Sequence, residues 1–454
     1  MCPQNCIHPA PGEVGFELAE TLYIDPRSCI DCTACVEACP ASAIKHEREL
    51  TIVERRDALR NEEFFRDTPV VSLRPTRRDA GRRALIHRNG RWSIAIVGSG
   101  PAALYTLREI LQRSGSVRVT VFEKYAEIGG LLRRGVSRDH PRVREMIRLF
   151  DVPFNDDRVE VVYGTEVGVD ISIGDLRRDF DAVVLACGAS EPISVGSRDA
   201  VDAGDFYQAI DILVADNCEL PDPVRFENLG PRCAVIGAGN VALDIVRYIV
   251  ARRVHAVADA VTELLVLSRS DRVAFTPSAF YEIADLENVE VVVDSAGSAV
   301  DMSVPSRFLR DVAGLEAVDV TDADDIGTNT GTLRVILSFG SEVTDIEKMD
   351  RGLTRIATSS GRAFMANSVI SAAGFRMKEL GGIPVSDRGV VLNRQGRVIS
   401  RETGEALEGL YVTGWAKRGS TGGVGDNRVC AAETVAQLAT DLARKSVGAR
   451  FVED

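Results

Sequence analysis

The sequence of 454 residues predicts an α/β protein in which a small α+β module precedes two doubly wound, mostly parallel sheets. Two segments, 93–103 and 233–242, predict the sheets, because each joins an apolar run of strand length to a glycine-rich turn and the start of a helical pattern. The distribution of cysteines predicts the small module, since six of the ten cysteines lie within the first forty residues. The chain therefore divides into a cysteine-rich part and two nucleotide-binding parts.

Composition narrows the classes of function. A net charge of −13 argues against nucleic acid as a partner. No apolar stretch is long enough for a membrane span, and the N-terminus lacks the charged start and apolar run of a signal peptide. Cysteines that are gathered for a cluster, rather than spread as a disulfide framework, indicate a reducing compartment. We therefore expect a cytoplasmic protein.

The cysteine-rich segment carries the spacing C-x2-C-x2-C-x3-C-P, formed by Cys29, Cys32, Cys35 and Cys39. This is the bacterial ferredoxin pattern for iron–sulfur clusters. Three thiolates at two-residue gaps on one loop can hold three corners of a [4Fe-4S] cluster, and the fourth cysteine serves the other cluster in two-cluster ferredoxins. Residues 1–50 are therefore predicted to form a ferredoxin-like module, and the Arg-rich residues 51–92 a linker over the surface.

The first nucleotide unit opens with a strand over 93–97 and the turn Gly98-Ser99-Gly100-Pro101-Ala102-Ala103. The first glycine of such a turn permits a tight bend, the second lets backbone approach a pyrophosphate, and the small third residue lets the helix pack on the strand. The helix N-terminus offers free N–H groups and a positive dipole end to phosphates. Glu123 ends the next strand, where a carboxylate can take both ribose hydroxyls, which favours FAD.

The second unit repeats the pattern with a strand over 233–236 and the turn Gly237-Ala238-Gly239-Asn240-Val241-Ala242. Its next strand ends without an acid and runs into Arg269 and Arg272, whose guanidinium groups can pair with a 2′-phosphate. We therefore assign NADPH to this unit, although Asp271 keeps NADH as a competitor. The predicted domains are an FAD-binding domain over 93–195 and 366–454 and an NADPH-binding domain over 196–365.

Further motifs follow one another along the chain: Val97 to Ala103, Phe122 to Lys124, Gly129 to Leu131, Arg134 to Val136, Asp139 to Pro141, Gly239 to Asp244, Ala274 to Thr276, and Gly414 to Gly419 running into Thr421 to Asn427. In this order they resemble the adrenodoxin-reductase-type ferredoxin–NADP reductases. The particular resemblance is to the actinobacterial form with a ferredoxin module at its N-terminus. It covers roughly residues 2–47 and 93–440.

The resemblance implies a role for each matching residue. The FAD adenosine and pyrophosphate would be held by Gly98, Ser99, Gly100, Pro101, Ala102, Glu123 and Leu131. The isoalloxazine ring would be lined by Trp415 and the backbone of Gly422, Gly423 and Val424. NADPH would rest on Gly239, Asn240 and Val241, with Arg269 at its 2′-phosphate and Gly422 near its nicotinamide. His140 would lie close to the flavin, where it tunes the flavin or exchanges protons with it; a structural hydrogen bond is the competing interpretation.

The sequence departs from the family pattern at three places. Where the family usually has two arginines followed by Gly-Pro, this chain has Ser268-Arg269-Ser270-Asp271, and this change should weaken the binding of a phosphate. Ala279 stands where a Glu is usual, with Glu282 the nearby acid, and Asp426 replaces a small hydroxyl residue of the flavin loop. These departures bear on nicotinamide preference and turnover, not on the fold.

A further departure concerns Cys2-Pro3, which looks like the end of an upstream cysteine run. In the family's two-cluster modules, such a cysteine completes the cluster held by the downstream run. The resemblance thus implies [4Fe-4S] ligation by Cys2, Cys29, Cys32 and Cys35, with Cys6 a non-ligand. Cys39 would then serve a second cluster whose other ligands precede Met1, and we expect the natural start to lie upstream. If the chain begins at Met1, we expect one cluster, with Cys39 competing with Cys2.

The predicted function is that of an FAD-dependent ferredoxin–NADP(+) oxidoreductase, which passes electrons between NADPH and iron–sulfur centres of its own module, of an external ferredoxin, or of both. A disulfide reductase is disfavoured, because no C-x2-C or C-x4-C pair occurs among Cys187, Cys218, Cys233 and Cys430. The electron-input subunit of a glutamate-synthase-like complex is the main alternative. A non-enzymatic electron carrier with a vestigial dinucleotide domain is a weaker one.

Overall fold

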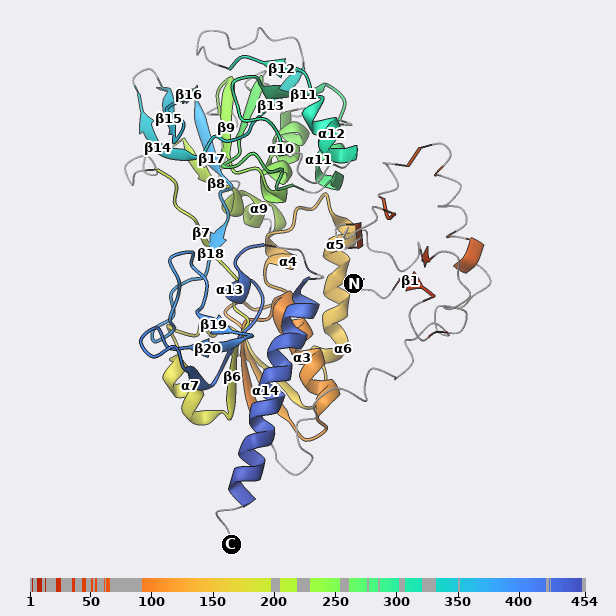
Figure 1. The fold of residues 1–454 in the computed structure, drawn as a ribbon, viewed down its shortest axis with the longest axis vertical. Helices are drawn as coiled ribbons and strands as arrows, with labels where there is room; N and C mark the ends of the chain where they lie inside the picture. Colours follow the sequence, from red (N-terminus) through yellow and green to blue (C-terminus); the bar gives the residue numbers. More distant parts are fainter. Residues whose placement is uncertain are drawn as a thin grey trace. The chain divides into compact units, whose positions relative to one another are not determined.

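The computed structural model divides the chain into two compact units, one formed by Met1–Glu191 and Phe375–Asp454 and the other by Pro192–Gly374 (Figure 1). The structure describes residues 92–196, 205–218, 229–253, 261–275, 277–284, 286–301, 307–320, 332–349, 352–421, 424 and 426–450, and, of the N-terminal part, 2, 6–9, 13, 22–25, 35–36, 43–45, 50–51, 54, 61 and 63–65. Five predicted site residues lie outside this description: Cys29, Cys32, Cys39, Gly422 and Gly423.

The first unit contains, in its described part, a seven-stranded sheet of order β19-β20-β21-β6-β3-β4-β5. The strands are β3 (Ser93–Val97), β4 (Arg118–Phe122), β5 (Val159–Val162), β6 (Ala182–Leu185), β19 (Asn393–Arg394), β20 (Arg397–Ile399) and β21 (Ala406–Val412). The pairs from β21 to β5 are parallel, and β19 and β20 are antiparallel. The strand before the first glycine turn, β3, therefore lies inside a mostly parallel sheet, as predicted.

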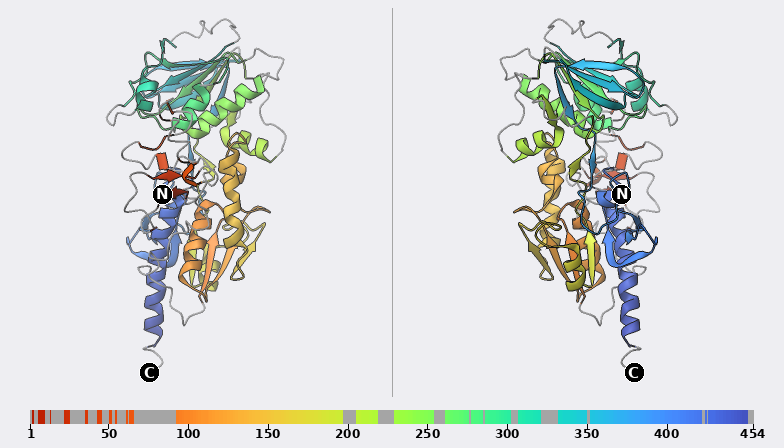
Figure 2. Two further views of the ribbon diagram at one scale, coloured as in Figure 1. Left: turned by 90° about the vertical axis from the view of Figure 1, so that its right-hand side faces the viewer. Right: turned by 90° about the vertical axis from the view of Figure 1, so that its left-hand side faces the viewer.

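Both faces of this sheet are buried, which explains why β3 is a continuous apolar run. Ile94 and Ile96 face a core shared with α3 (Pro101–Arg113) and the long helix α14 (Asp426–Arg450). Ala95 and Val97 face a second core that includes Leu176 of α7 (Ile173–Asp179). Helices α3 and α14 pack against each other, so the end of the chain completes the first domain (Figure 1 and Figure 2).

The second unit contains, within its described residues, a seven-stranded parallel sheet of order β12-β11-β13-β10-β9-β17-β8. The strands are β8 (Phe206–Gln208), β9 (Arg232–Ile236), β10 (Glu263–Leu267), β11 (Val289–Asp294), β12 (Ala317–Val318), β13 (Leu333–Ser338) and β17 (Ser368–Ser371). The strand that precedes the second glycine turn, β9, again lies between two parallel neighbours, β10 and β17.

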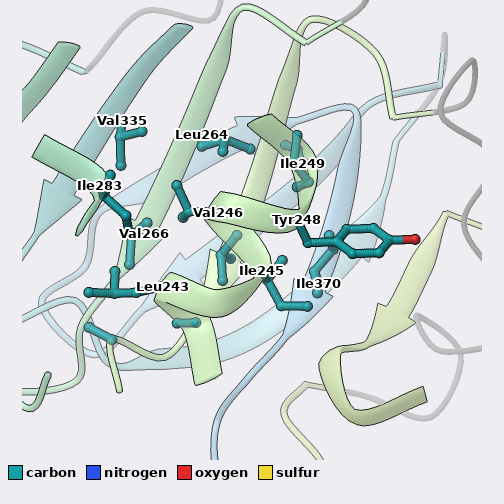
Figure 3. Close-up of a cluster of buried hydrophobic side chains, with 14 of the residues drawn as sticks. Leu243, Ile245, Val246, Tyr248, Ile249, Leu264, Val266, Ile283, Val335 and Ile370 are labelled. Atoms are coloured by element: carbon teal, nitrogen blue, oxygen red, sulfur yellow. The ribbon is translucent and has the colours of Figure 1, made fainter. Parts of the chain in front are cut away.

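The two faces of the second sheet are covered differently. Cys233 and Val235 of β9 face the helices α9 (Ala209–Asn217), α10 (Asn240–Arg253), α11 (Pro277–Ala284) and α12 (Arg307–Ala313), and Figure 3 shows how α10 packs on this face. Ala234 and Ile236 face an antiparallel sheet of β14 (Val343–Lys348), β15 (Thr354–Thr358) and β16 (Ala363–Ala366). A doubly wound sheet has helices on both faces, so this covering sheet is a feature that the sequence pattern did not predict.

The remaining elements are short: β1 (Ile7–His8), β2 (Tyr23–Ile24), α4 (Leu131–Arg134), α5 (Pro141–Arg144), η5 (Glu145–Phe150), α6 (Asp151–Phe154), β7 (Glu191–Pro192), β18 (Phe375–Arg376) and α13 (Trp415–Arg418). Strands β7 and β18 pair with each other in a two-stranded sheet. Over the described ranges, no helix combines the length and the apolar character that crossing a membrane would require.

Part of the predicted linker packs on the N-terminal module. The side-chain oxygen of Asn61 accepts a hydrogen bond of 3.0 Å from the N–H of Ile24, and the ring of Phe64 stacks on Tyr23 at 4.2 Å between centroids. Phe65 is only 1% exposed and meets the ring of His8 edge-on. The buried ring of Phe65 and the stacked ring of Phe64 join this short segment to the module.

Candidate functional site

The first glycine turn leaves space for backbone only. Gly98 has φ +94°, and a Cβ there would lie 2.8 Å from the carbonyl oxygen of Ala186, just after β6. Its N–H donates to the carbonyl of Phe122 at the end of β4 (2.8 Å). Gly100 is the N-cap of α3 and offers no side-chain cap, so the first N–H groups of the helix stay available for an anion. This geometry fits a pyrophosphate.

Glu123 lies beside this turn, at the carboxyl end of β4. Its side chain is buried, and Oε2 accepts hydrogen bonds from the N–H (3.0 Å) and the hydroxyl of Ser99. Oε1 accepts from the N–H of Tyr125 (2.9 Å). A carboxylate has about four acceptor positions, so these three bonds fix its orientation and leave capacity for a ribose hydroxyl. The sequence-predicted pair of glycine turn and acid is thus brought together.

The second glycine turn repeats the first. Gly237 has φ +106°, its N–H donates to the carbonyl of Leu267 at the end of β10 (2.9 Å), and a Cβ would lie 2.3 Å from the carbonyl oxygen of Ala372 after β17. Gly239 has no heavy atom within 4 Å of the place of a Cβ, so space for a ligand remains at the start of α10. Asn240 and Val241 form the first turn of this helix.

The loop after β10 explains one departure from the family pattern. Ser268 is 4% exposed; its hydroxyl donates to the carbonyl of Ser270 (2.9 Å), and its carbonyl accepts from the N–H of Ser341 (2.7 Å). A buried position of this kind suits a small hydroxyl residue better than an arginine. The next residue, Arg269, is exposed. Arg272 is also exposed, and its Nε lies 3.3 Å from Oδ2 of Asp301.

The C-terminal loop closes over the first turn of α3. Gly414 has φ +68°, and a Cβ there would lie 2.5 Å from Cβ of Ala102. The next residue, Trp415, starts α13, and its ring lies nearly parallel to Phe375 with 6.4 Å between centroids. Because of this close approach, the segment that carries Trp415 lies beside the FAD turn, although more than three hundred residues separate them in sequence.

Asn427 and Arg418 hold the end of that loop. Nδ2 of Asn427 donates to the carbonyl of Val424 (3.2 Å), and Oδ1 accepts from Nη1 of Arg418 (3.2 Å). Nη2 of Arg418 is buried and has no hydrogen-bond partner in the described part of the protein. Buried donors are normally satisfied, so a ligand oxygen fits this position. Together with the glycine turn, this donor supports an FAD site in the first unit.

The N-terminal module brings Cys2 and Cys6 together. Their sulfur atoms lie 3.1 Å apart, and the N–H of Cys6 points to the sulfur of Cys2 (3.3 Å). Strands β1 and β2 pair antiparallel, so the chain that leads to the C-x2-C run returns beside these cysteines. Cys35 lies in a helical turn. No group of three metal-ligating side chains forms among the residues that are described, a set that excludes Cys29, Cys32 and Cys39.

Known proteins match the chain along almost its whole length. A model of the pyridine nucleotide-disulphide oxidoreductase family matches residues 92–288, and a model of the 4Fe-4S binding domain matches residues 22–45. A probable ferredoxin/ferredoxin–NADP reductase of Mycobacterium tuberculosis (strain ATCC 25618 / H37Rv) is 31% identical over 97% of this chain and 81% of its own length. The chain belongs to the ferredoxin/ferredoxin–NADP reductase family.

Two further relatives agree with this family. A probable ferredoxin/ferredoxin–NADP reductase of Mycobacterium leprae (strain TN) is 30% identical over 97% of this chain and 83% of its own length. Among solved structures, FprA of Mycobacterium tuberculosis in complex with NADPH is similar with a TM-score of 0.63 and 25% identity, over 79% of this chain and 86% of that chain. The predicted resemblance, enzyme class and α/β fold class are therefore confirmed.

In this reductase, Leu131 and His140 lie on one connected segment. The N–H of Gly129 donates to the carbonyl of Ser99 (3.1 Å), which ties the start of α4 at Leu131 to the FAD turn. Nη1 of Arg144 donates to the carbonyls of Arg133 (3.1 Å) and Val136 (2.8 Å) and so joins α5 to α4. His140 directly precedes α5 and is half-buried. Its role toward the flavin stays a prediction.

Cys187 and Cys233, which lie outside the module, have surroundings that disfavour thiol chemistry. Burial raises the pKa of the Cys187 thiol to about 11 and that of Cys233 to about 12. Only a thiolate attacks a disulfide readily, so these two side chains are poor nucleophiles. The sulfur of Cys430 accepts a hydrogen bond from the N–H of Gly414 (3.2 Å) and so helps to hold the loop before Trp415.

Proposed function

We propose that this chain is an FAD-dependent NADPH:ferredoxin oxidoreductase. The observation that carries the proposal is the repeated turn: Gly98 and Gly237 each lie between the ends of two neighbouring parallel strands, just before the start of a helix. Two dinucleotide sites in one chain are what electron transfer between a nicotinamide and a flavin requires. When bound, FAD supplies the conversion between the two-electron chemistry of NADPH and the one-electron chemistry of iron–sulfur clusters.

In the FAD site, the chain's own residues would bind and orient the cofactor. Glu123, held by Ser99 and the N–H of Tyr125, would take the ribose hydroxyls, and the helix N-terminus after Gly100 would face the pyrophosphate. Leu131 and Trp415, with the backbone of 422–424, would enclose the rest of the cofactor, and His140 would act on the flavin through a hydrogen bond. No side-chain nucleophile is needed, because hydride and electron transfer depend on orientation and potential.

In the coenzyme site, Gly239, Asn240 and Val241 would carry the pyrophosphate of NADPH at the start of α10. Arg269 would pair with the 2′-phosphate, since it carries an exposed guanidinium group in the loop that follows β10. The proposed domains are those predicted from sequence, an FAD-binding domain over 93–195 and 366–454 with a coenzyme domain over 196–365 inserted into it; chain crossings at 191/192 and 374/375 support an inserted domain.

In the module, Cys2, Cys29, Cys32 and Cys35 would hold a [4Fe-4S] cluster, with Cys39 competing with Cys2 for the fourth position. Iron and acid-labile sulfide analysis, together with low-temperature EPR of Cys2→Ser and Cys39→Ser variants, tests this ligand set. Loss of the cluster EPR signal in Cys2→Ser, with the signal retained in Cys39→Ser, supports this ligand set. An unchanged cluster in Cys2→Ser contradicts it.

The proposed electron acceptor is the chain's own module, an external ferredoxin, or both in sequence. Because the module is part of the chain, its docking is intramolecular, at an effective concentration on the order of millimolar. We also propose a cytoplasmic location, because cysteines used as cluster ligands require a reducing compartment.

The decisive experiment is anaerobic addition of NADPH to the purified holoenzyme. We expect the oxidised flavin absorbance to disappear first and the EPR signal of the reduced cluster to follow. If dithionite fully reduces the flavin and the cluster but NADPH reduces neither, the proposed function is contradicted.

A further inference from the structure

The loop after β10, which would bind the 2′-phosphate, contains two arginines that differ in their ion pairing. Arg269 is exposed and makes no hydrogen bond or ion pair with the described residues. Arg272 has an acidic neighbour: its Nε lies 3.3 Å from Oδ2 of Asp301, with 80% of the arginine side chain and 23% of the aspartate side chain exposed. The loop therefore presents one free cation and one cation that is already neutralised.

Asp301 is held at this place by backbone pairing. Its N–H donates to the carbonyl of Asp271 (2.9 Å). The same loop is fixed from the other side, because Gly340 and Ser341 donate to the carbonyls of Ser270 (3.1 Å) and Ser268 (2.7 Å). The carboxylate of Asp301 thus belongs to the fixed surroundings of the loop, and it adds a negative charge beside the one that Asp271 contributes.

We propose that Asp301 sets the coenzyme preference of this enzyme by holding Arg272 away from the 2′-phosphate of NADPH. The proposal rests on the proposed function, in which the loop after β10 reads the ribose of the nicotinamide coenzyme. With Arg272 paired to Asp301, Arg269 alone meets the phosphate, and NADPH gains Arg272 only by breaking that ion pair. The 2′-hydroxyl of NADH is uncharged, so the binding of NADH does not depend on Arg272. Asp301 therefore lowers the discrimination between the two coenzymes and keeps NADH usable.

An exposed ion pair is weak, and its strength decides the expected size of the effect. The free energy of such a pair is the most that its removal can return to the binding of NADPH. Releasing Arg272 should therefore let it move to a phosphate. We expect Asp301→Asn to raise the ratio of kcat/KM for NADPH to that for NADH by about two- to fivefold, the size of one exposed ion pair. The change should lie in KM for NADPH and leave kcat nearly constant, because the contact is remote from the hydride.

The experiment compares four forms of the holoenzyme: wild type, Asp301→Asn, Arg272→Ala and the double variant. Asp301→Asn keeps the shape of the side chain and the backbone hydrogen bond to Asp271, so the loop should fold. Glu347→Gln, at an exposed position of β14, is the control for loss of one negative charge. We expect the preference for NADPH to rise in Asp301→Asn alone and to stay near the wild-type value in Arg272→Ala, in the double variant and in the control.

Calorimetric binding of 2′-AMP and of 5′-AMP gives a second readout that does not depend on turnover. Asp301→Asn should bind 2′-AMP more tightly, with no change for 5′-AMP. The proposal is overturned if the preference and the 2′-AMP affinity are unchanged in Asp301→Asn, or if the gain persists in the double variant. Failure of the wild type to oxidise either coenzyme would instead contradict the proposed function.

Discussion

The carboxylate of Glu123 accepts hydrogen bonds from both the N–H and the hydroxyl of Ser99, so the end of β4 is locked to the first glycine turn. Both side chains are buried. The acid that should bind the FAD ribose is therefore oriented by the turn that should bind the FAD pyrophosphate.

Glu123→Gln should weaken FAD binding, because the amide has one acceptor oxygen instead of two and its NH2 group faces the N–H of Ser99 or of Tyr125. We expect about a tenfold loss of affinity, the size of one charge-assisted bond. The ratio of flavin to protein after purification and dilution measures this. Glu160→Gln, at an exposed position of β5, is the matched control and should keep its flavin. Equal flavin content in the two variants would contradict the role.

Gly237→Ala should abolish the use of NADPH while leaving flavin in place. The added Cβ would lie 2.3 Å from the carbonyl oxygen of Ala372, and the φ of +106° is unfavourable for alanine. We expect at least a hundredfold loss in kcat/KM for NADPH, since a small displacement of a binding turn has such an effect. Dithionite should still reduce the flavin. Gly381→Ala, where a Cβ meets nothing, is the control and should be fully active.

Arg269→Ala should raise KM for NADPH by about tenfold and leave KM for NADH unchanged, because only NADPH carries the 2′-phosphate. Steady-state kinetics with both coenzymes measure the two constants. A parallel rise for both coenzymes would place Arg269 elsewhere than at the phosphate.

Arg428→Ala should slow the reduction of the cluster but not of the flavin. Nη1 of Arg428, at the start of α14, donates to the carbonyl of Cys2 (3.4 Å), so a cation lies beside a proposed cluster ligand. Nearby charge and hydrogen bonds set cluster potentials, and we expect a lower potential and about threefold slower appearance of the reduced-cluster EPR signal. Lys445→Ala, farther along α14, is the control. Equal rates in both variants would rule out this role for Arg428.

Asp441 should stabilise the first unit in a pH-dependent way. Burial alone would raise its pKa, but hydrogen bonds from Arg397 and Tyr411 outweigh it and lower the pKa below the ordinary 3.8. A carboxyl with a lowered folded pKa stabilises above its unfolded pKa, and this contribution is lost as pH falls through the folded value.

Asp441→Asn should therefore reduce stability at neutral pH by about 1–2 kcal/mol, or roughly 4 °C in Tm. The deficit relative to wild type should shrink below about pH 4. Calorimetric melting at several pH values measures it, with Glu402→Gln as an exposed control. A deficit that is independent of pH would mean that packing, not the charge, stabilises this site.

Sequence reasoning could reach much of the site because its signals are local. A glycine turn, its strand and its helix occupy about a dozen consecutive residues, as at 93–103. The acid at Glu123 follows at a fixed interval. The order of such motifs sufficed to predict the family and the pair of cofactors. The antiparallel sheet over the second domain escaped prediction, because β14 to β16 alternate like any half-buried strands and nothing local says which surface they cover.

The sequence by itself determined that this chain has two dinucleotide turns, a ferredoxin-type cysteine run and an acid after the first turn but not after the second. The tertiary structure decided why only glycine fits at 98 and 237, because the opposing carbonyls of Ala186 and Ala372 directly follow strands that are distant in sequence. It also decided that Arg272 meets Asp301 and that Trp415 lies beside the first turn. The physical reason is the same in each case: local periodicity encodes an element, whereas parallel strand pairing decides which distant loops meet at one edge of a sheet.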